Sequence, residues 1–213
     1  MMKIAPGLMV CSSNTSFVEC AAVLMAQVRL PDPVLLVIAA FSRHSTLLTE
    51  VCAALESAFG PVTLTSLPYD FIQTTYYQAA MGSGLKKVFF VFNDLVPADS
   101  LANFKIQTNS MEETVAAGKH YDEQRPLNLD PGILTLGKFM LATTKDQAHR
   151  LYLQDGIYAE VTLRFEAGEF SPWPWTYADY RQPCVLAFLK EAREFYRRRL
   201  LEEKSRPEKG AGR

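Results

Sequence analysis

The sequence predicts an α+β fold in which helices lie on one face of a mainly antiparallel sheet. Two apolar runs of strand length, residues 34–41 and 87–92, predict buried strands. Two amphipathic segments, 45–59 and 98–117, repeat apolar residues at the three- and four-residue spacing of helices. With a short strand at 62–66 and a β-rich segment after the second helix, this order predicts a ferredoxin-like βαββαβ core.

Local signals set the ends of these elements. Ser45 is a residue type that caps a helix N-terminus, and Gly60 followed by Pro61 ends the first helix. Gly118 ends the second helix in the same way. A C-terminal β-hairpin or meander then precedes a terminal helix over 184–203, whose apolar side chains form one stripe: Val185, Leu189, Ala192, Tyr196 and Leu200.

One α+β domain is predicted over residues 31–203. The chain has 213 residues, of which 48% are hydrophobic, so it can bury one sizeable core. The two prolines of "LPDP" (30–33) separate this domain from an N-terminal extension, residues 1–30. Residues 204–213 are predicted to form a disordered basic tail.

The charge balance argues against a strong overall electrostatic field. The chain has 22 Lys or Arg against 23 Asp or Glu, so it attracts neither nucleic acid nor an anionic membrane as a whole. Residues 193–213 carry eight Lys or Arg and four Glu, a local excess of four positive charges. We interpret this run as a solvated helix end and tail. A weak contact with RNA or phosphate through the tail is the alternative, and we expect no other nucleic-acid partner.

Cysteine usage and hydropathy predict a cytoplasmic protein with no membrane partner. The cysteines, at positions 11, 20, 52 and 184, show no paired spacing, as expected of free thiols in a reducing compartment. No apolar run reaches the roughly 18 residues that a membrane span requires.

Residues 150–165 predict a β-hairpin. The odd-numbered residues from Ile157 to Phe165 are apolar and alternate with polar ones, which indicates a half-buried strand. A two-residue turn at Asp155–Gly156 would mix the two faces, so we predict a three-residue loop, 154–156, instead. This register brings the charged groups of one pair within about 4 Å. The predicted pairs are Arg150 with Glu160, Leu151 with Ala159, Tyr152 with Tyr158, and Leu153 with Ile157.

Polar side chains around this hairpin favour a pocket built from residues 128–165. The stretch "LATTK" supplies Thr143, Thr144 and Lys145, and hydroxyls with a cation are typical of a phosphate or carboxylate cradle. "NLDPG" predicts a tight turn in which Asn128 and Asp130 fix backbone groups. A cross-strand salt bridge and a plain turn are the structural alternatives.

Two aromatic stretches also permit two interpretations. "WPWTYADYR" (173–181) packs a connection against the core, or it forms a lid that stacks on a base or sugar. In "PYDFIQTTYYQAAMGSGLKK" (68–87), two glycines precede Lys86 and Lys87. They form either a backbone nest that receives phosphate together with both lysines or a flexible loop before a strand.

Several familiar motifs are missing from the sequence. It has no GxxxxGK[ST] phosphate loop and no GxSxG nucleophile elbow. The three histidines, at positions 44, 120 and 149, are isolated, so we expect no metal site, and no cofactor can be named.

As a set, these stretches resemble a bacterial family known only as domain of unknown function 4416. The resemblance covers about residues 34–200 and implies no activity, cofactor or partner. It departs from the family's expected pattern at Ile133, where we expect Tyr, and at Ala79–Ala80, where we expect a carboxylate. The matching stretches are "FIQTTYYQAAMG", "NLDPG", "LATTKDQAHRLYL", "GIYAEVTL" and "WTYADYR".

Two functional hypotheses follow, and the sequence decides neither for nor against catalysis. In the first, the chain binds a small anionic ligand that is phosphorylated and nucleotide-like, with His149 and Glu160 as candidate proton-transfer residues. In the second, it is a non-catalytic adaptor domain, and the same polar residues are a structural network. The candidate ligand-binding residues are Asn128, Asp130, Thr143, Thr144, Lys145, Arg150, Tyr152, Tyr158, Tyr76, Tyr77, Trp175 and Tyr177.

Overall fold

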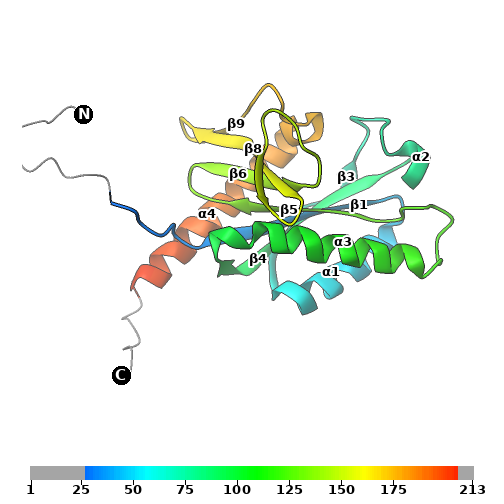
Figure 1. The fold of residues 1–213 in the computed structure, drawn as a ribbon, viewed down its shortest axis with the longest axis horizontal. Coiled ribbons are helices and arrows are strands. Elements are labelled where there is room, and N and C mark those ends of the chain that lie inside the picture. The colour runs from blue at the N-terminus through cyan, green and yellow to red at the C-terminus, as the bar shows by residue number, and fades with distance from the viewer. Residues whose placement is uncertain (1–26, 206–213) are drawn as a thin grey trace, which may run out of the picture. The chain divides into compact units, whose positions relative to one another are not determined.

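An antiparallel sheet forms the centre of the fold in the computed structural model, which describes residues 27–205 (Figure 1). Within these residues the sheet has nine strands, and four α-helices and two 3₁₀ helices accompany them. The elements in chain order are β1 (Val34–Ser42), α1 (Ser45–Phe59), β2 (Val62–Thr65), β3 (Tyr69–Asp70), α2 (Gln78–Met81), β4 (Lys86–Val96), η1 (Ala98–Ser100), α3 (Leu101–Ala117), β5 (Asn128–Leu134), β6 (Lys138–Thr143), β7 (Leu151–Gln154), β8 (Ile157–Glu166), β9 (Glu169–Pro172), η2 (Ala178–Arg181) and α4 (Pro183–Ser205).

The strands lie in the order β2-β4-β1-β5-β6-β8-β7, with β3 beside β4 and β9 beside β8. All of their pairings are antiparallel. The predicted α+β class with a mainly antiparallel sheet is therefore confirmed. The predicted strands at 34–41, 62–66 and 87–92 correspond to β1, β2 and β4, and the predicted helices at 45–59, 98–117 and 184–203 correspond to α1, η1 with α3, and α4.

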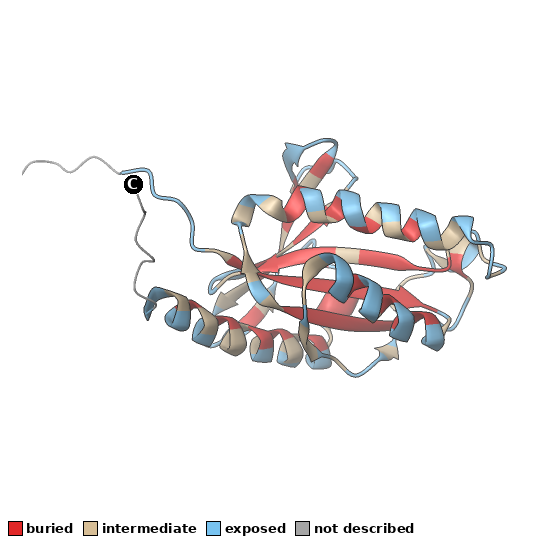
Figure 2. Cartoon of the chain, turned by 90° about the horizontal axis from the view of Figure 1, so that it is seen from below, coloured by how far each residue is buried: buried red, intermediate tan, exposed pale blue. Residues whose placement is uncertain are grey.

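Both faces of β1 are buried, because its side chains alternate between two cores. The odd-numbered side chains from Leu35 to Ala39 pack against α4. The even-numbered ones from Leu36 to Ala40 pack against α1 and α3. Figure 2 shows these buried strands between helices on either side. The core helices α1 and α3 lie on one face as predicted, and the terminal helix α4, whose face the sequence did not predict, covers the other, because a strand that is apolar on both faces needs two covers.

The "NLDPG" stretch is part of a strand, so the predicted tight turn there is wrong. β5 pairs with β1 from Asn128 to Leu134, but it pairs with β6 only over Gly132–Leu134. The N–H and carbonyl groups of successive residues in a strand point alternately to its two neighbouring strands. Those of Leu129 point to the β6 side, where Lys105 and Glu112 bind them, and the backbone of Pro131, two residues further on, faces the same side. Pro131 has no N–H to donate there, so it is tolerated where the two strands part.

The hairpin between β7 and β8 has a different turn from the predicted one. Asp155 (φ +51°) and Gly156 (φ +76°) form a two-residue turn with both φ angles positive. The two-residue turn pairs Gln154, and not Leu153, with Ile157. An irregularity at Leu153 then shifts the pairing by one residue, so that the strand pairs beyond it in the predicted register. The predicted pairs of Leu151 with Ala159 and Tyr152 with Tyr158 are present.

The prediction that the odd-numbered residues of β8 share one buried face is also wrong. Ile157 packs with the N-terminal end of α3, whereas Leu163 packs with α4. A register shift between β6 and β8, opposite Phe139 and Met140, turns the strand over between these positions.

Most of the predicted N-terminal extension, residues 1–30, and of the predicted basic tail, residues 204–213, lies outside the described residues. Within residues 27–205, no helix has the length and hydropathy that a membrane crossing needs.

We predict that Gly132→Ala destabilises the protein by about 1–3 kcal/mol, because overpacking at a rigid contact carries a cost of that order. A Cβ at this position would lie 2.6 Å from both the Met140 carbonyl oxygen and the Phe139 ring. Gly137→Ala, in the turn before β6, is the matched control, since a Cβ there meets nothing within 4 Å. Urea unfolding of both variants measures the difference, and equal stabilities would contradict the close approach of β5 and β6.

Candidate functional site

A cavity of about 430 Å³ opens where β5 and β6 part. Asn128 and Asp130 enter it from β5, and Ala142 and Thr143 from the end of β6. Lys105 of α3 also lines it, although α3 covers the sheet face opposite to α4. The cavity is therefore set into the sheet, in the gap between two strands that are paired further along.

Two charged side chains of α3 replace the missing β6 partner of Leu129. Its N–H donates to Glu112 Oε1 at 2.7 Å, and its carbonyl oxygen accepts from Lys105 Nζ at 2.8 Å. Arg125 donates to the other carboxylate oxygen of Glu112 at 2.7 Å. These contacts explain why Lys105 and Glu112 are buried on a helix face that is otherwise apolar or small.

Burial outweighs these attractions for the Glu112 carboxyl group. Desolvation raises its pKa above the ordinary value of 4.5, while Lys105, Arg125 and the Leu129 N–H act in the opposite direction.

Lys87 is a second buried cation, only 1% exposed, at the other side of the cavity. Its Nζ lies 2.7 Å from the Asp179 carboxylate and 3.8 Å from that of Asp130. The rings of Phe41, Phe71, Phe89 and Tyr180 surround it, with centroids 4.5–5.7 Å from Nζ. Lys87 thereby ties β4 to η2, and cation–π contacts compensate part of its lost hydration.

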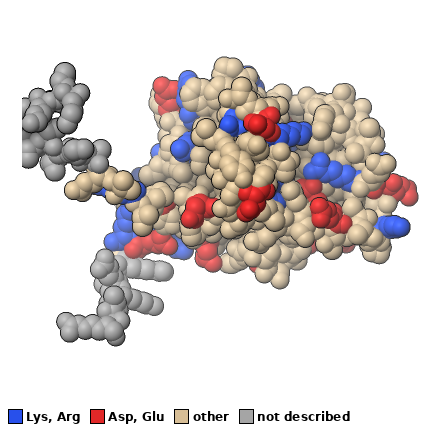
Figure 3. Space-filling model, in the orientation of Figure 1, with Lys and Arg blue, Asp and Glu red and all other residues tan. Residues whose placement is uncertain are grey.

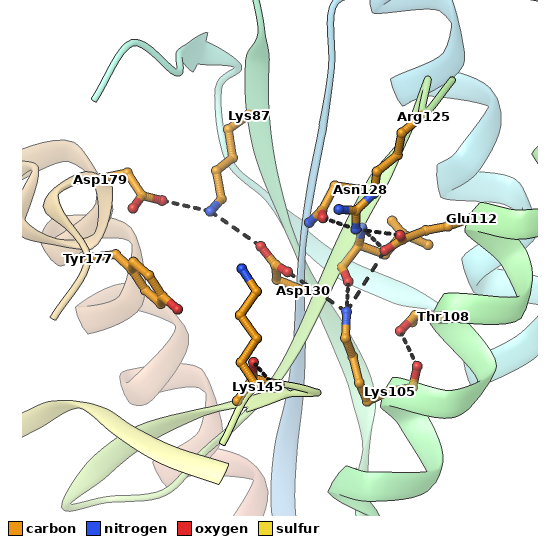
Figure 4. Close-up of polar contacts among 12 residues, drawn as sticks. Lys87, Lys105, Thr108, Glu112, Arg125, Asn128, Asp130, Lys145, Tyr177 and Asp179 are labelled. Atoms are coloured by element: carbon orange, nitrogen blue, oxygen red, sulfur yellow. Dashed lines mark hydrogen bonds and ion pairs between the residues drawn. The ribbon is translucent and has the colours of Figure 1, made fainter. Parts of the chain in front are cut away.

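Asp130 lies between the two buried lysines (Figure 4). Its oxygens are 3.8 Å from Lys87 Nζ and 4.0 Å from Lys105 Nζ. Its side chain is 25% exposed, whereas that of Asp179 is 6% exposed. Asp130 is thus the more accessible of these two carboxylates to a molecule in the cavity.

Arg150 and Glu160 form the ion pair predicted from the hairpin register. Nε of Arg150 lies 2.9 Å from Glu160 Oε2, and both side chains are buried. Arg150 also donates to the Lys145 carbonyl oxygen at 2.9 Å and to the Tyr177 hydroxyl at 2.6 Å. His149 Nε2 lies 3.3 Å from the same carboxylate oxygen. Arg150 therefore holds the segment before β7 and the segment before η2 against β8.

Lys145 lies at the mouth of the cavity. Its Nζ donates to the Tyr76 hydroxyl at 3.1 Å, and this hydrogen bond lowers the pKa of Tyr76. Its backbone N–H donates to the Thr143 hydroxyl at 3.2 Å. Among the described residues, no carboxylate lies within salt-bridge distance of the Lys145 ammonium.

Most of the candidate residues from the sequence line this cavity, but five do not. Arg150 and His149 lie behind it, in contact with Glu160. Tyr152 and Tyr158 pack edge to face against each other on the hairpin, and Trp175 donates to the Val161 carbonyl oxygen. Tyr152, Tyr158 and Trp175 were predicted to bind the ligand, but they do not line this cavity, because their polar and aromatic contacts are made elsewhere. The candidates that line the cavity are Asn128, Asp130, Thr143, Thr144, Lys145, Glu160, Tyr76, Tyr77 and Tyr177.

The two aromatic stretches divide between structure and cavity. In "WPWTYADYR", Asp179 and Tyr180 are buried and line the inner cavity, Tyr177 lines it with a more exposed ring, and the two tryptophans do not line it. Lys86 pairs with Asp70 at 2.6 Å, away from Lys87, because neighbouring residues of a strand point to opposite faces. Of the two alternatives for this stretch, a phosphate nest that uses both lysines is therefore not supported.

Sequence reasoning missed several cavity residues that lie on elements predicted from their apolar pattern. Lys87 begins the apolar run of β4, and Lys105 lies on the buried stripe of α3. The sequence did contain a signal for them, namely a charged residue at a position that the apolar pattern places in the core. Because a buried charge requires a partner, such a residue indicates a polar site nearby. The missed charged or aromatic lining residues are Phe41, Phe71, Lys87, Lys105, Arg125, Asp179 and Tyr180.

The site carries a small excess of positive charge. Five cations face four carboxylates, which leaves one positive charge uncompensated. Elsewhere, charges of both signs are interspersed on the face of the molecule in Figure 3. The cations are Lys87, Lys105, Arg125, Lys145 and Arg150, and the carboxylates are Glu112, Asp130, Glu160 and Asp179.

The fold and the site define an α+β domain with a polar cavity set into an antiparallel sheet. The chain belongs to the family described as Domain of unknown function (DUF4416), whose model matches residues 32–196. The resemblance drawn from the sequence motifs is thereby confirmed. Comparisons with curated proteins and with solved structures gave no match.

We predict that Glu160→Leu costs about 3–5 kcal/mol of stability, because it leaves the Arg150 charge buried without its partner. Adding Arg150→Met should recover a large part of this loss, since an apolar pair of similar volume needs no compensation. Glu166→Leu, which removes an exposed ion pair with Arg164, is the control and should change stability by at most about 1 kcal/mol. A double variant no more stable than Glu160→Leu would contradict this account.

The raised pKa of Glu112 predicts a pH dependence with a definite sign. The folded protein binds this proton more tightly than the unfolded chain does, so the contribution of Glu112 to stability is fully present below pH 4.5 and is lost as the pH rises through the folded-state pKa. The difference in unfolding free energy between the wild type and Glu112→Gln should therefore fall from pH 4 to pH 7. A difference that grows with pH would show that the ion pairs outweigh desolvation.

Proposed function

We propose that this chain binds a small phosphorylated molecule of nucleotide-like structure in the cavity between β5 and β6. The observation that carries the proposal is the Lys145 ammonium, which lies at the mouth without a carboxylate partner among the described residues. The hydroxyls of Thr143 and Thr144 line the same edge. An ammonium beside two hydroxyls is suited to phosphate oxygens.

The size and lining of the cavity support a ligand larger than phosphate alone. A volume of about 430 Å³ falls within the range of about 300–1,000 Å³ of small-molecule sites. The side chains of Tyr76, Tyr77 and Tyr177 line it and give part of the cavity an aromatic wall suited to a planar group. The buried Lys87 and Lys105 add positive potential behind the mouth.

The carboxylates in the cavity indicate that the ligand also carries hydrogen-bond donors. Asp130 is partly exposed, and Glu160 and Asp179 line the wall. These carboxylates would repel a ligand that has only anionic groups, whereas they would accept hydrogen bonds from the hydroxyls of a ribose. Of the two candidate proton-transfer residues, Glu160 lines the cavity and His149 does not, so we assign that role to Glu160 in this proposal.

The finer topology belongs to the same proposal. The four strands β2-β4-β1-β5 are all antiparallel to their neighbours, and α1 and α3 connect them on one face. This order supports a ferredoxin-like βαββαβ core, with β6 to β9 and α4 as additions. The cytoplasmic location expected from the cysteines stays a prediction.

A second candidate function is supported by β7, which lies at an end of the strand order. Leu151 and Tyr152 are 74% and 61% exposed, and Leu153 beside them is also exposed. An edge strand with exposed apolar side chains is suited to pairing with another protein. In this alternative the chain is a non-catalytic adaptor, and the cavity residues are a structural network.

A thermal-shift panel separates the two candidates. Ligands at 100 times their Kd stabilise a protein by about 2.7 kcal/mol, so a phosphorylated ligand of the right class should raise the melting temperature by several degrees. The panel contains inorganic phosphate, ribose 5-phosphate, nucleoside monophosphates and citrate. A shift with the organic phosphates supports the cavity, and no shift with any compound favours the adaptor.

We predict that Lys145→Ala weakens the binding of the best organic phosphate by about 10- to 100-fold. Removing a charged hydrogen-bond donor costs about 1.5–3 kcal/mol. Lys138→Ala is the matched control, because Lys138 is exposed at the other end of β6 and does not line the cavity. Isothermal titration measures both variants, and equal affinities would contradict the assignment of Lys145 as the phosphate-binding residue.

A further inference from the structure

The Asn128 amide has a fixed orientation. Its Oδ1 accepts a hydrogen bond from Nη2 of Arg125. A guanidinium only donates, so the amide oxygen faces Arg125 and Nδ2 faces the opposite way. Arg125 is in turn held by Glu112 at 2.7 Å and lies over the Tyr77 ring, 6.0 Å from its centroid.

The Nδ2 group of Asn128 is a buried donor without a partner among the described residues, on a residue that lines the cavity. The residue is 2% exposed and lines the cavity. Within residues 27–205, Nδ2 has no hydrogen-bond partner. A buried donor without an acceptor costs about 1–3 kcal/mol, so a group in the cavity that accepts this hydrogen bond gains that contribution. Its position is preorganised, because β5 is paired with β1 at Asn128 and Phe41.

This arrangement gives the Asn128 amide one orientation, with its oxygen toward Arg125 and its donor group away from it. An asparagine amide with both groups free can accept a hydrogen bond through its oxygen and donate one through its NH₂ group. It therefore does not distinguish a ring carbonyl from a ring amino group, because its amide can turn to match either one. Here the amide oxygen is turned toward Arg125 and accepts its hydrogen bond, so Nδ2 is the group that points away from Arg125. The remaining N–H groups are complementary to a carbonyl oxygen and would face the N–H groups of an exocyclic amine, which leaves both donors unpaired.

Asn128 and Lys145 border the cavity at different places. In Figure 4 the Lys145 ammonium and the Asn128 amide lie on opposite sides of Asp130. The Tyr77 ring lines the cavity and packs beneath Arg125, the partner of Asn128. A ligand with its phosphate at Lys145 therefore directs its other end toward the amide and the aromatic lining.

We infer that Asn128 is a specificity-determining residue that selects nucleotide-like phosphates with a carbonyl oxygen, in place of an amino group, at position 4 of a pyrimidine ring or position 6 of a purine ring. This inference rests on the proposed phosphate-binding function. It narrows the ligand class to molecules with a uracil-like or hypoxanthine-like ring.

Two matched pairs of nucleotides test this selection on the unaltered full-length protein. Uridine and cytidine monophosphates share the C2 carbonyl and differ at C4, which carries a carbonyl oxygen in uridine and an amino group in cytidine. Inosine and adenosine monophosphates differ in the same way at C6. Isothermal titration should give at least tenfold tighter binding for the carbonyl member of at least one pair. Equal affinities within both pairs, or tighter binding of the amino members, would overturn the inference.

Asn128→Asp then tests the residue. The substitution preserves the shape and the contact with Arg125, but it replaces the free donor with an acceptor. The carbonyl nucleotide should bind at least tenfold more weakly, and the preference within the pair should disappear or reverse. Asn103→Asp on the exposed side of α3 is the control for the added charge and should keep the preference.

The outcomes distinguish this inference from the proposed function. Binding that depends on Lys145 but shows no carbonyl preference would overturn the role of Asn128 and leave the phosphate site standing. No binding of any nucleotide or sugar phosphate would overturn both. A preference that survives in Asn128→Asp would assign the selection to another residue.

Discussion

The rest of the site depends on one constraint, which is that the backbone N–H and carbonyl groups of Leu129 need hydrogen-bond partners. A strand that parts from its neighbour leaves an N–H and a carbonyl group without partners, and leaving them unpaired in a protein interior is costly. Glu112 and Lys105 satisfy both groups. Glu112 then requires Arg125, and Arg125 takes the amide oxygen of Asn128. One open place in the sheet thus determines the charges and the hydrogen-bonding character of the inner cavity.

The periodic elements were predictable because their signal is local. An apolar run such as β1, or a stripe such as that of α4, follows directly from which side chains are buried. "NLDPG" was wrongly predicted as a turn, because proline and glycine usually mark turns. Here contacts with another strand explain both residues. Pro131, which has no N–H, lies where β5 and β6 are not paired, and Gly132, which has no Cβ, leaves room for the Phe139 ring. Neither cause is visible without the partner strand.

The site was predictable only where a hairpin brings its residues together. The pairing of Arg150 with Glu160 follows from strand register, and two different turns lead to the same register for that pair. The contact between Lys87 and Asp179 joins residues 92 positions apart, and no short pattern encodes it. The missed cations Lys87 and Lys105 have their nearest partners, Asp179 and the Leu129 carbonyl oxygen, on other elements.

The ion pair of Lys87 with Asp179 also has a consequence during protein synthesis. A nascent chain that has left the ribosome only as far as Pro172 lacks both Asp179, the nearer carboxylate partner of Lys87, and the helix that covers one face of β1. Until α4 emerges, that apolar face stays open to other chains and to chaperones that hold unfolded segments. The segment from Tyr177 to Tyr180 therefore completes the cavity, and the C-terminal helix after it covers the face through which the nascent sheet is prone to aggregate.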